Sequence, residues 1–325
     1  MVLEEFLKEW NNGSDKVTVH TSGSTGVPKA MLVEKKRMEA SARITCDFLG
    51  LQPGDTALLC MPLDYIAAKM MVVRSIVRGL KLINIPPAGH PLALGDRSLD
   101  TVIHFAAMVP LQVYNSMQVP QEKIRLMQIR NLIIGGGAID ARMEAELKKF
   151  PYAVWSTYGM TETLSHIALR RLSGKDADGW YTPFDTVSVS LNADHCLVID
   201  APLVCADTLT TNDIAEIASD GRRFRIVGRR DNVICSGGIK IQIEDVERAL
   251  KPHLTMPFIV TKRKDGKFGE IVILLVRSAD TASAKAVCEK FLPKYWQPRH
   301  IIAVDHIPMT PTGKPARAEA EKMAM

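Results

Sequence analysis

The stretch Thr21-Ser22-Gly23-Ser24-Thr25-Gly26-Val27-Pro28-Lys29 decides how the rest of this chain is interpreted. It follows a short β-branched run at 17–20 and precedes a helix expected from about Glu34 to Phe48, so we predict strand, loop and helix in that order. Small residues let a phosphate approach the backbone closely, and the hydroxyls add donors. Lys29 adds a point charge suited to phosphate oxygens. Because Lys29 follows Pro28, the spacing is not that of a Walker A loop. An ordinary Ser/Gly turn is the alternative.

The length and composition are those of a globular protein of roughly two domains. The chain has 325 residues, 46% of them hydrophobic, which is enough for a sizeable core. Its net charge is only +5 and its basic residues are scattered. This pattern does not favour a nucleic-acid partner. A mildly basic surface would suit polyanionic small molecules.

The cysteines and the apolar segments predict a soluble cytoplasmic protein. The six cysteines are widely spaced and form no C-x-x-C pair, so free thiols are expected and a zinc or redox site is not. The N-terminus carries acids where a signal peptide needs basic residues and an apolar core. The apolar stretch from 70 to 77 is flanked and broken by charged residues, which argues against a membrane span.

A second stretch with chemical potential is Trp155-Ser156-Thr157-Tyr158-Gly159-Met160-Thr161-Glu162-Thr163. Tyr158 offers an aromatic face and Thr161 a hydroxyl. Glu162 is a hard oxygen ligand of the kind that Mg²⁺ takes when it binds nucleotide phosphates. A half-buried core aromatic and an acid at a helix start are the alternatives for Tyr158 and Glu162.

Three further segments stand out along the chain. The apolar run 131–134 leads into Gly135-Gly136-Gly137, where backbone can approach a flat ring or a phosphate. Gly228-Arg229-Arg230-Asp231 follows the apolar run 224–227. Near the end of the chain stands Pro308-Met309-Thr310-Pro311-Thr312-Gly313-Lys314. A lysine in a tail is ordinarily a solvated charge.

Taken together and in this order, these segments resemble the motifs of the adenylate-forming superfamily, which includes acyl- and aryl-CoA ligases, luciferases and peptide-synthetase adenylation domains. The resemblance implies an α/β fold with a large N-terminal AMP-binding domain over 1–228, β-rich from about 180 to 228. A small, mobile α+β domain over 229–325 would follow. The superfamily usually has a hundred or more residues before the phosphate loop. About twenty stand here, so we expect a shortened member without the usual first subdomain.

The resemblance also implies roles for individual residues. Lys314 would be catalytic, Glu162 would hold Mg²⁺, Asp231 would be the hinge between the domains, and Gly238 would leave room for the pantetheine arm of CoA. ATP phosphates would be bound by Thr21, Ser22, Gly23, Ser24, Thr25, Gly26, Lys29 and Thr161. Adenine and ribose would be bound by Gly135, Gly136, Gly137, Tyr158, Asp213 and Arg229. In Thr211-Asn212-Asp213, Asn212 stands where the superfamily usually has glycine.

The acid-binding residues implied by the resemblance are Tyr65, Lys69, Ser165 and His166. Thr161-Glu162-Thr163-Leu164-Ser165-His166 resembles the version found in o-succinylbenzoate–CoA ligases of menaquinone synthesis. Ser165 and His166 could then bind polar groups of an aromatic dicarboxylate, and Lys69 could meet a carboxylate. A solvated surface lysine is the alternative for Lys69, and a structural histidine for His166.

The expected function is therefore an ATP-dependent acid–CoA ligase that uses ATP, Mg²⁺ and CoA and forms an acyl adenylate. A ligase for another aryl, fatty or amino acid stays open, because Asp64 lies near the place of an amino-group anchor. A weakly catalytic nucleotide-binding protein is the second alternative. The identity of the acid, the acceptor thiol and a homo-oligomeric state are left open by the sequence.

Overall fold

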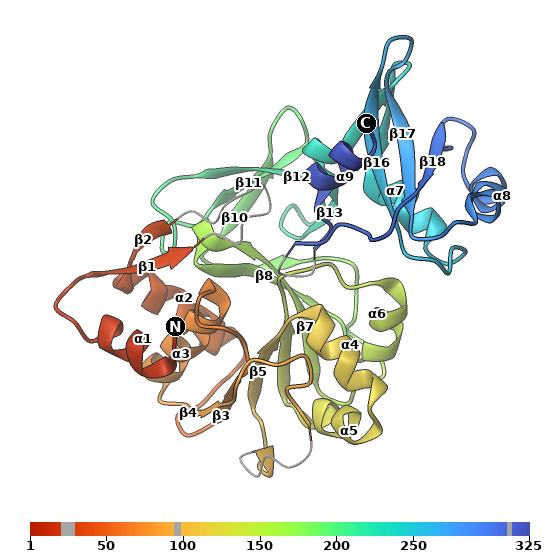
Figure 1. Ribbon diagram of the computed structural model, residues 1–325. Helices are drawn as coiled ribbons and strands as arrows, with labels where there is room; N and C mark the ends of the chain where they lie inside the picture. The colour runs from red at the N-terminus through yellow and green to blue at the C-terminus, as the bar shows by residue number, and fades with distance from the viewer. Residues whose placement is uncertain (21–29, 94–98, 311–313) are drawn as a thin grey trace. The chain divides into compact units, whose positions relative to one another are not determined.

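The structure is a computed structural model that describes residues 1–20, 30–93, 99–310 and 314–325. It divides into two compact units (Figure 1). The N-terminal unit comprises Met1–Ser190, Val198–Leu209 and Ile217–Arg225, and the C-terminal unit comprises Leu191–Leu197, Thr210–Glu216 and Ile226–Met325. The predicted domain limits of 1–228 and 229–325 stay a prediction, because the two compact units exchange short segments of the chain between residues 191 and 225.

The chain begins with a helix and a β-hairpin around the predicted phosphate loop. Helix α1 (Leu3–Trp10) is followed by β1 (Lys16–His20), β2 (Ala30–Glu34) and α2 (Lys35–Phe48). The predicted order of strand, loop and helix was wrong because it omits β2. This strand pairs antiparallel with β1, and Val17 lies opposite Val33. Both valines are buried, so the pairing of β2 with β1 covers apolar side chains of both strands.

A seven-stranded sheet forms the centre of the N-terminal unit, in the order β4-β3-β5-β6-β7-β8-β9. Strands β4, β3, β5, β6 and β7 pair in parallel, whereas β8 pairs antiparallel with both β7 and β9 at one edge. The strands are β3 (Thr56–Leu59), β4 (Lys81–Asn84), β5 (Phe105–Met108), β6 (Asn131–Ile134), β7 (Ala153–Met160), β8 (Ser165–Arg171) and β9 (Thr182–Pro183).

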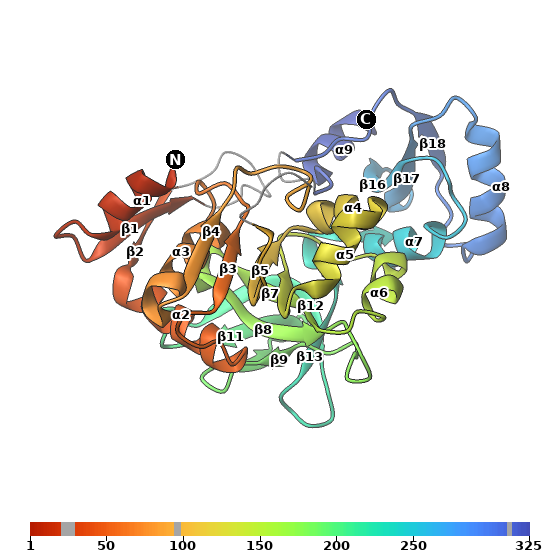
Figure 2. The same ribbon diagram turned by 90° about the horizontal axis from the view of Figure 1, so that it is seen from below.

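Helices cover both faces of this sheet. In Figures 1 and 2, α2 and α3 lie on one face, and α4, α5 and α6 lie on the other. The bounds are α3 (Ile66–Arg78), α4 (Pro110–Gln118), α5 (Pro120–Gln128) and α6 (Ala141–Leu147). Burial on both faces explains why the parallel strands read as continuous apolar runs rather than alternating ones. The predicted α/β class is confirmed.

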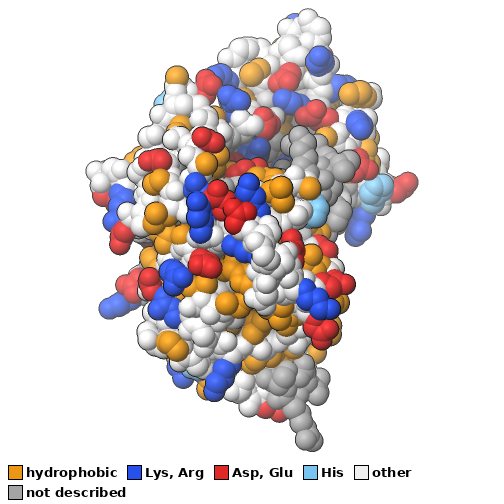
Figure 3. Space-filling view, turned by 90° about the vertical axis from the view of Figure 1, so that its left-hand side faces the viewer, with side chains coloured by type: hydrophobic (Ala, Val, Ile, Leu, Met, Phe, Trp, Pro, Cys, Tyr) orange, Lys and Arg blue, Asp and Glu red, His pale blue; other side chains and the backbone are white. Residues whose placement is uncertain are grey.

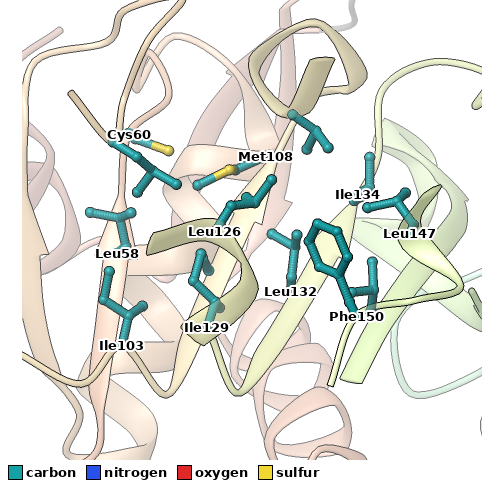
Figure 4. Packing of buried hydrophobic residues seen from close by; sticks show 14 of the residues in the cluster. Leu58, Cys60, Ile103, Met108, Leu126, Ile129, Leu132, Ile134, Leu147 and Phe150 are labelled. Atoms are coloured by element: carbon teal, nitrogen blue, oxygen red, sulfur yellow. The ribbon is translucent and has the colours of Figure 1, made fainter. Parts of the chain in front are cut away.

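The apolar layer between the sheet and α4–α6 is continuous (Figure 4). Strand residues Leu58, Met108 and Leu132 pack there with Leu126 of α5 and Leu147 of α6. Close packing of this kind holds the ends of the strands in fixed positions. The carboxyl ends of β6 and β7, which carry two of the predicted motifs, therefore stand on a rigid support.

The predicted β-rich segment forms strands β10 to β13, which pair in sequence order as a four-stranded sheet. They are β10 (Ser188–Leu191), β11 (Cys196–Asp200), β12 (Leu209–Ile217) and β13 (Phe224–Arg229). The boundary between the two compact units falls within these strands. The short helix η3 (Arg230–Asn232) follows β13 directly.

The rest of the C-terminal unit is a five-stranded sheet with helices on both faces. Its strands are β14 (Val233–Ser236), β15 (Ile239–Gln242), β16 (Phe258–Asp265), β17 (Gly269–Val276) and β18 (His300–Ala303). Helices α7 (Ile243–Leu250) and α8 (Thr281–Phe291) pack on one face, and α9 (Arg317–Met323) packs on the other. The predicted α+β character of this part of the chain is confirmed.

The charge distribution agrees with the composition. On the face seen in Figure 3, acidic and basic side chains are interspersed, so this face carries no continuous basic surface for a nucleic-acid backbone. Over the described ranges, no helix combines the length and the apolar character that crossing a bilayer requires.

Candidate functional site

Most of the predicted site residues fall into three groups in the structure. The phosphate-loop residues Thr21, Ser22, Gly23, Ser24, Thr25, Gly26 and Lys29 lie outside the described residues. A second group lies at the ends of β6, β7 and β8 in the N-terminal unit. A third lies on β12, β13 and the chain before α9 in the C-terminal unit.

The glycines at the end of β6 and β7 are explained by close packing. A Cβ at Gly135 would overlap the Thr157 hydroxyl of the neighbouring strand, and one at Gly159 would overlap the backbone of Ser165 and His166. Gly136 has φ of +81°, which favours glycine. These positions therefore need glycine for the fold, whether or not a nucleotide lies against them.

The aromatic ring of Tyr158 is half-buried on β7. It packs edge-on against Phe224 at 5.1 Å between centroids and lies 5.8 Å from the ring of Tyr181. Thr161 is buried in the turn η2 (Thr161–Thr163), whereas the neighbouring Glu162 is exposed. Glu162 is thus available to an ion at the surface, and the roles of all three residues toward a nucleotide remain predictions.

A buried polar chain connects β8 with α2 and α3. Arg74 donates from Nη2 to Ser165 Oγ at 2.9 Å, and Ser165 Oγ lies 3.2 Å from His166 Nδ1. His166 Nε2 lies 3.2 Å from Thr45 Oγ1, which itself donates to the Ser41 carbonyl. Because the Thr45 proton is used there, we assign the histidine Nε2 as the donor to Thr45 and Nδ1 as the acceptor from Ser165.

This arrangement keeps His166 neutral. Burial lowers the pKa of His166 well below 6.5, and the positive charge of Arg74 lowers it further. The series of donors begins at Arg74, and within the described residues its Nε has no hydrogen-bond partner. His166 is 5% exposed, so it is not a solvated acid or base.

Arg74 was missed by sequence reasoning, although it is the most unusual residue of this group. It is 1% exposed, and burial lowers the pKa of its guanidinium to about 10. In the part of the chain that the structure describes, no carboxylate pairs with it, and its Nε has no hydrogen-bond partner. A buried cation is costly unless an anion offsets it. A signal was available, because Arg74 interrupts the apolar face of α3.

Lys69, predicted at the acid site, is placed elsewhere. Its side chain is 1% exposed, so the alternative of a solvated surface lysine was wrong. Nζ donates to the Thr18 carbonyl at 2.6 Å and pairs with Glu9 at 3.7 Å. Lys69 thus ties α1 and β1 to α3. Tyr65 forms a backbone bridge to His20 and is the residue directly before α3. Roles of Tyr65 and Lys69 toward an acid remain predictions.

The third group brings the predicted ribose, hinge and catalytic residues together. Arg229 contacts Asp213 through Nη1 at 3.3 Å and Asp231 through Nη2 at 3.0 Å. The pKa of Lys314 is lowered from 10.5 by burial and by Arg229, and Asp213 acts in the opposite direction. Lys314 therefore lies within electrostatic reach of both residues, as a convergent site requires.

The backbone around Lys314 is held at both ends. Lys314 N donates to Thr310 Oγ1 at 3.0 Å, and its carbonyl accepts from Thr310 N at 2.7 Å. Arg317 forms a bidentate pair with Glu247 at 2.6 and 2.7 Å and donates to the Val260 carbonyl of β16. The sequence did not single out this clamp. It fixes the start of α9, three residues beyond Lys314.

Gly237 and Gly238 form the two-residue turn between β14 and β15, and both have positive φ (56° and 83°). Such a turn needs two left-handed residues, which explains the pair locally. The space beside Gly238 is open, as nothing lies within 4 Å of a Cβ placed there. The predicted path for a pantetheine arm is compatible with this geometry and stays untested.

A comparison with protein families decides the affiliation of the chain. The model of the family described as AMP-binding enzyme matches residues 9–201, which is more than half of the chain. This chain belongs to the AMP-binding enzyme family. Its mixed α/β architecture is that of an acyl-CoA synthetase fold, as solved structures show.

Individual proteins of similar sequence or structure are known. A 2-succinylbenzoate–CoA ligase of Listeria monocytogenes is 23% identical over 95% of this chain and 70% of its own length. One from Geobacillus kaustophilus is 26% identical over 99% of this chain and 72% of its own length.

Among solved structures, an acyl-CoA synthetase (AMP-forming)/AMP-acid ligase II-like protein from Dyadobacter fermentans has 29% identity and a TM-score of 0.66, with 98% and 92% of the two chains covered. An o-succinylbenzoate CoA synthetase from Bacillus subtilis, solved with its acyl-adenylate intermediate, has 20% identity and a TM-score of 0.76 over 93% of this chain and 68% of its own. The latter likeness shows the fold alone.

Proposed function

We propose that this AMP-binding enzyme is an ATP-dependent, AMP-forming acid–CoA ligase whose acid is o-succinylbenzoate, and that it serves menaquinone biosynthesis. The proposal is supported by family membership, by relatives named 2-succinylbenzoate–CoA ligase and by the side chains around Arg74. We place the reaction in the cytoplasm, in keeping with six cysteines that are all unpaired.

The chemistry runs in two steps. The acid carboxylate attacks the α-phosphate of ATP, forming the acyl–phosphate bond and releasing pyrophosphate. The thiolate of CoA then attacks the acyl carbon, forming the thioester and releasing AMP. Both steps depend mainly on positioning and on stabilisation of developing charge. Lys314 would stabilise charge in the first step, and Asp213 and Arg229 would hold the ribose.

The donor set suits Mg²⁺ bound to ATP. Mg²⁺ usually takes one or two carboxylate oxygens from a protein and completes its shell with phosphates and water. Glu162 is exposed and would supply one such oxygen. No group of three or more His, Cys, Asp or Glu side chains is gathered for a metal within the described ranges. An ion held jointly with ATP is therefore the arrangement that fits, and it would neutralise phosphate charge.

The observation that carries the choice of acid is the buried Arg74, which pairs with no carboxylate of the described residues. A dicarboxylic acid keeps one carboxylate after the other is adenylated, and this second anion would offset the charge of Arg74. Ser165 accepts from Arg74 and donates to His166, so these two side chains would hold the guanidinium in place for that anion. A monocarboxylic acid would leave Arg74 uncompensated.

The second step requires Lys314 to withdraw. One lysine cannot occupy the same place relative to the acyl adenylate in both steps, because the thiol needs access to the acyl carbon. We propose a rotation at Asp231 between the two half-reactions. The residues 229–231 link β13 to the C-terminal sheet and are therefore placed to change backbone conformation.

An amino-acid adenylating enzyme is the second candidate. The residue offered by the sequence as an amino-group anchor, Asp64, has a side chain that is 64% exposed, so it could meet a ligand. Arg74 disfavours this candidate, because it calls for a further anion. A weakly catalytic nucleotide-binding protein would bind ATP without releasing pyrophosphate.

A substrate screen with a matched pair of variants tests the proposal. We expect ATP–pyrophosphate exchange with o-succinylbenzoate to exceed exchange with benzoate, a fatty acid or an amino acid. Arg74→Met should raise KM for o-succinylbenzoate by about 10- to 100-fold, the worth of a charged hydrogen bond, and leave KM for ATP unchanged. Arg78→Met, one turn along α3, removes an arginine that pairs with Asp47 and should change neither KM. Equal KM shifts in both variants, or no exchange with any dicarboxylate, would refute the assignment.

A further inference from the structure

Asn212 departs from the superfamily pattern and makes contacts that a glycine could not make. Its Nδ2 donates to Asp231 Oδ2 at 3.2 Å, and its Oδ1 accepts from Arg230 Nη2 at 2.9 Å. All three residues belong to the C-terminal unit. One side chain on β12 thus bonds to two consecutive residues of the short helix η3.

The orientation of the carboxamide is set by its neighbours. The donor end faces an anion, and the acceptor end faces a cation. Turning the amide over would place NH₂ against the Arg230 guanidinium and the oxygen against the Asp231 carboxylate. Each hydrogen bond has one charged partner, which makes it stronger than a bond between neutral groups.

The same helix has other ties to the loops of the β10–β13 sheet. Arg230 pairs with Asp194 at 3.2 Å, and Asp231 also accepts from Arg229 at 3.0 Å. These are pairs of largely exposed charges, which contribute little and exchange readily with water. The Asn212 bonds differ because they connect the two hinge residues directly to the strand that carries Asp213.

We propose that Asn212 is a positioning residue that latches η3 to β12 and so holds Lys314 near Asp213 until the adenylate has formed. The inference deepens the proposed function, since it rests on a rotation at Asp231 between the two half-reactions. In this pose Lys314 is within electrostatic reach of Asp213 and Arg229, and the latch is closed. A backbone change at residue 231 that turns its side chain away from β12 breaks the bond between Asp231 and Asn212.

The latch should slow the second half-reaction relative to the first. A hydrogen bond to a charged group shifts the equilibrium between bonded and released η3 by about tenfold or more. Glycine at this position removes both Asn212 bonds, and it leaves the exposed ion pairs of Arg230 and Asp231 as described ties between η3 and the β10–β13 sheet. The chain with Asn212 therefore favours the adenylate-forming pose, and replacement by glycine should release the hinge.

The experiment compares Asn212→Gly and Asn212→Ala with the control Thr210→Gly, an exposed residue two positions earlier on the same strand. Amide hydrogen exchange over residues 229–236 of the full chain measures hinge opening without any substrate. The alanine variant separates loss of the side chain from a general effect of glycine on β12. ATP–pyrophosphate exchange and single-turnover transfer of a preformed acyl adenylate to CoA measure the two half-reactions.

We expect both Asn212 variants to raise hinge exchange by about tenfold, because two hydrogen bonds are lost, and the control to leave it unchanged. The ratio of thioester formation to adenylation should rise by a similar factor. Hinge exchange equal to that of the parent chain, or equally raised in Thr210→Gly, overturns the latch. If the parent chain shows no pyrophosphate exchange with any acid, the proposed function fails, and hydrogen exchange still decides whether Asn212 holds the hinge.

Discussion

The two groups of polar side chains differ in how their charges are balanced. Around Arg74 in the N-terminal unit, one buried cation leads a chain of neutral hydrogen-bonding groups, and no acid of the described chain offsets it. Around Arg229 in the C-terminal unit, acids and cations with side chains between 16% and 50% exposed lie beside one another. The first arrangement suits an anion supplied by a ligand, and the second suits groups that must change partners.

The physical reason lies in burial. An unpaired charge in the interior costs several kcal/mol and keeps its surroundings rigid, because each neighbour has a defined donor or acceptor role. Exposed ion pairs contribute about 0–1 kcal/mol each, so they can be broken and re-formed at little cost. We therefore assign acid recognition to the first group and the moving catalytic parts to the second.

The largest effect is expected at Lys314. Lys314→Ala removes the cation that stabilises charge on the reacting phosphate, and ATP–pyrophosphate exchange should fall by about 10²- to 10³-fold. Thermal unfolding should not change, because the backbone of this segment is held by Thr310 and Arg317. The control Lys240→Ala alters an exposed lysine of the same unit. Normal ATP–pyrophosphate exchange in the Lys314 variant would mean that the second group is not catalytic, and the proposed difference between the two groups would be wrong.

A smaller effect is expected from the clamp that supports Lys314. Arg317→Ala leaves Glu247, whose side chain is 24% exposed, without its bidentate partner. The free energy of unfolding in urea should fall by about 3 kcal/mol, since a partly buried pair is broken from one side. Arg248→Ala removes an exposed partner of Asp245 and should cost less than about 1 kcal/mol. Equal losses in the two variants would show that the clamp is no stronger than a surface pair.

The smallest effect is a pH dependence from the first group. The pKa of His166 lies well below 6.5 in the folded chain, so the unfolded chain binds a proton first as the pH falls. The contribution of His166 to stability is therefore complete above about pH 6.5 and is lost below it, by at most about 1.4 kcal/mol per pH unit. In His166→Gln, the free energy of unfolding in urea should fall less steeply than in the parent chain as the pH is lowered from 7 to 5. An unchanged slope would mean that His166 is not held neutral.

Much of the fold could be predicted from the sequence. Apolar runs and helical periodicity indicated β1, β6 and α2 close to their observed limits, because burial of one face or of both imposes those patterns. Strand β2 was missed, because its five residues follow a loop and precede a helix without a break in composition. Its pairing with β1 is a contact that local pattern does not carry.

The candidate site was predictable only in part. The order of the motifs in the sequence indicated the family. The sequence also determined which residue types are available for catalysis, since it specifies every side chain. The tertiary structure decided which of them meet. It showed Lys69 tied to Glu9 and Thr18, Arg74 buried beside Ser165, and Asn212 bonded to Arg230 and Asp231. These partners lie from about twenty to ninety residues apart, and only folding determines whether a charge faces water, an acid or a hydroxyl.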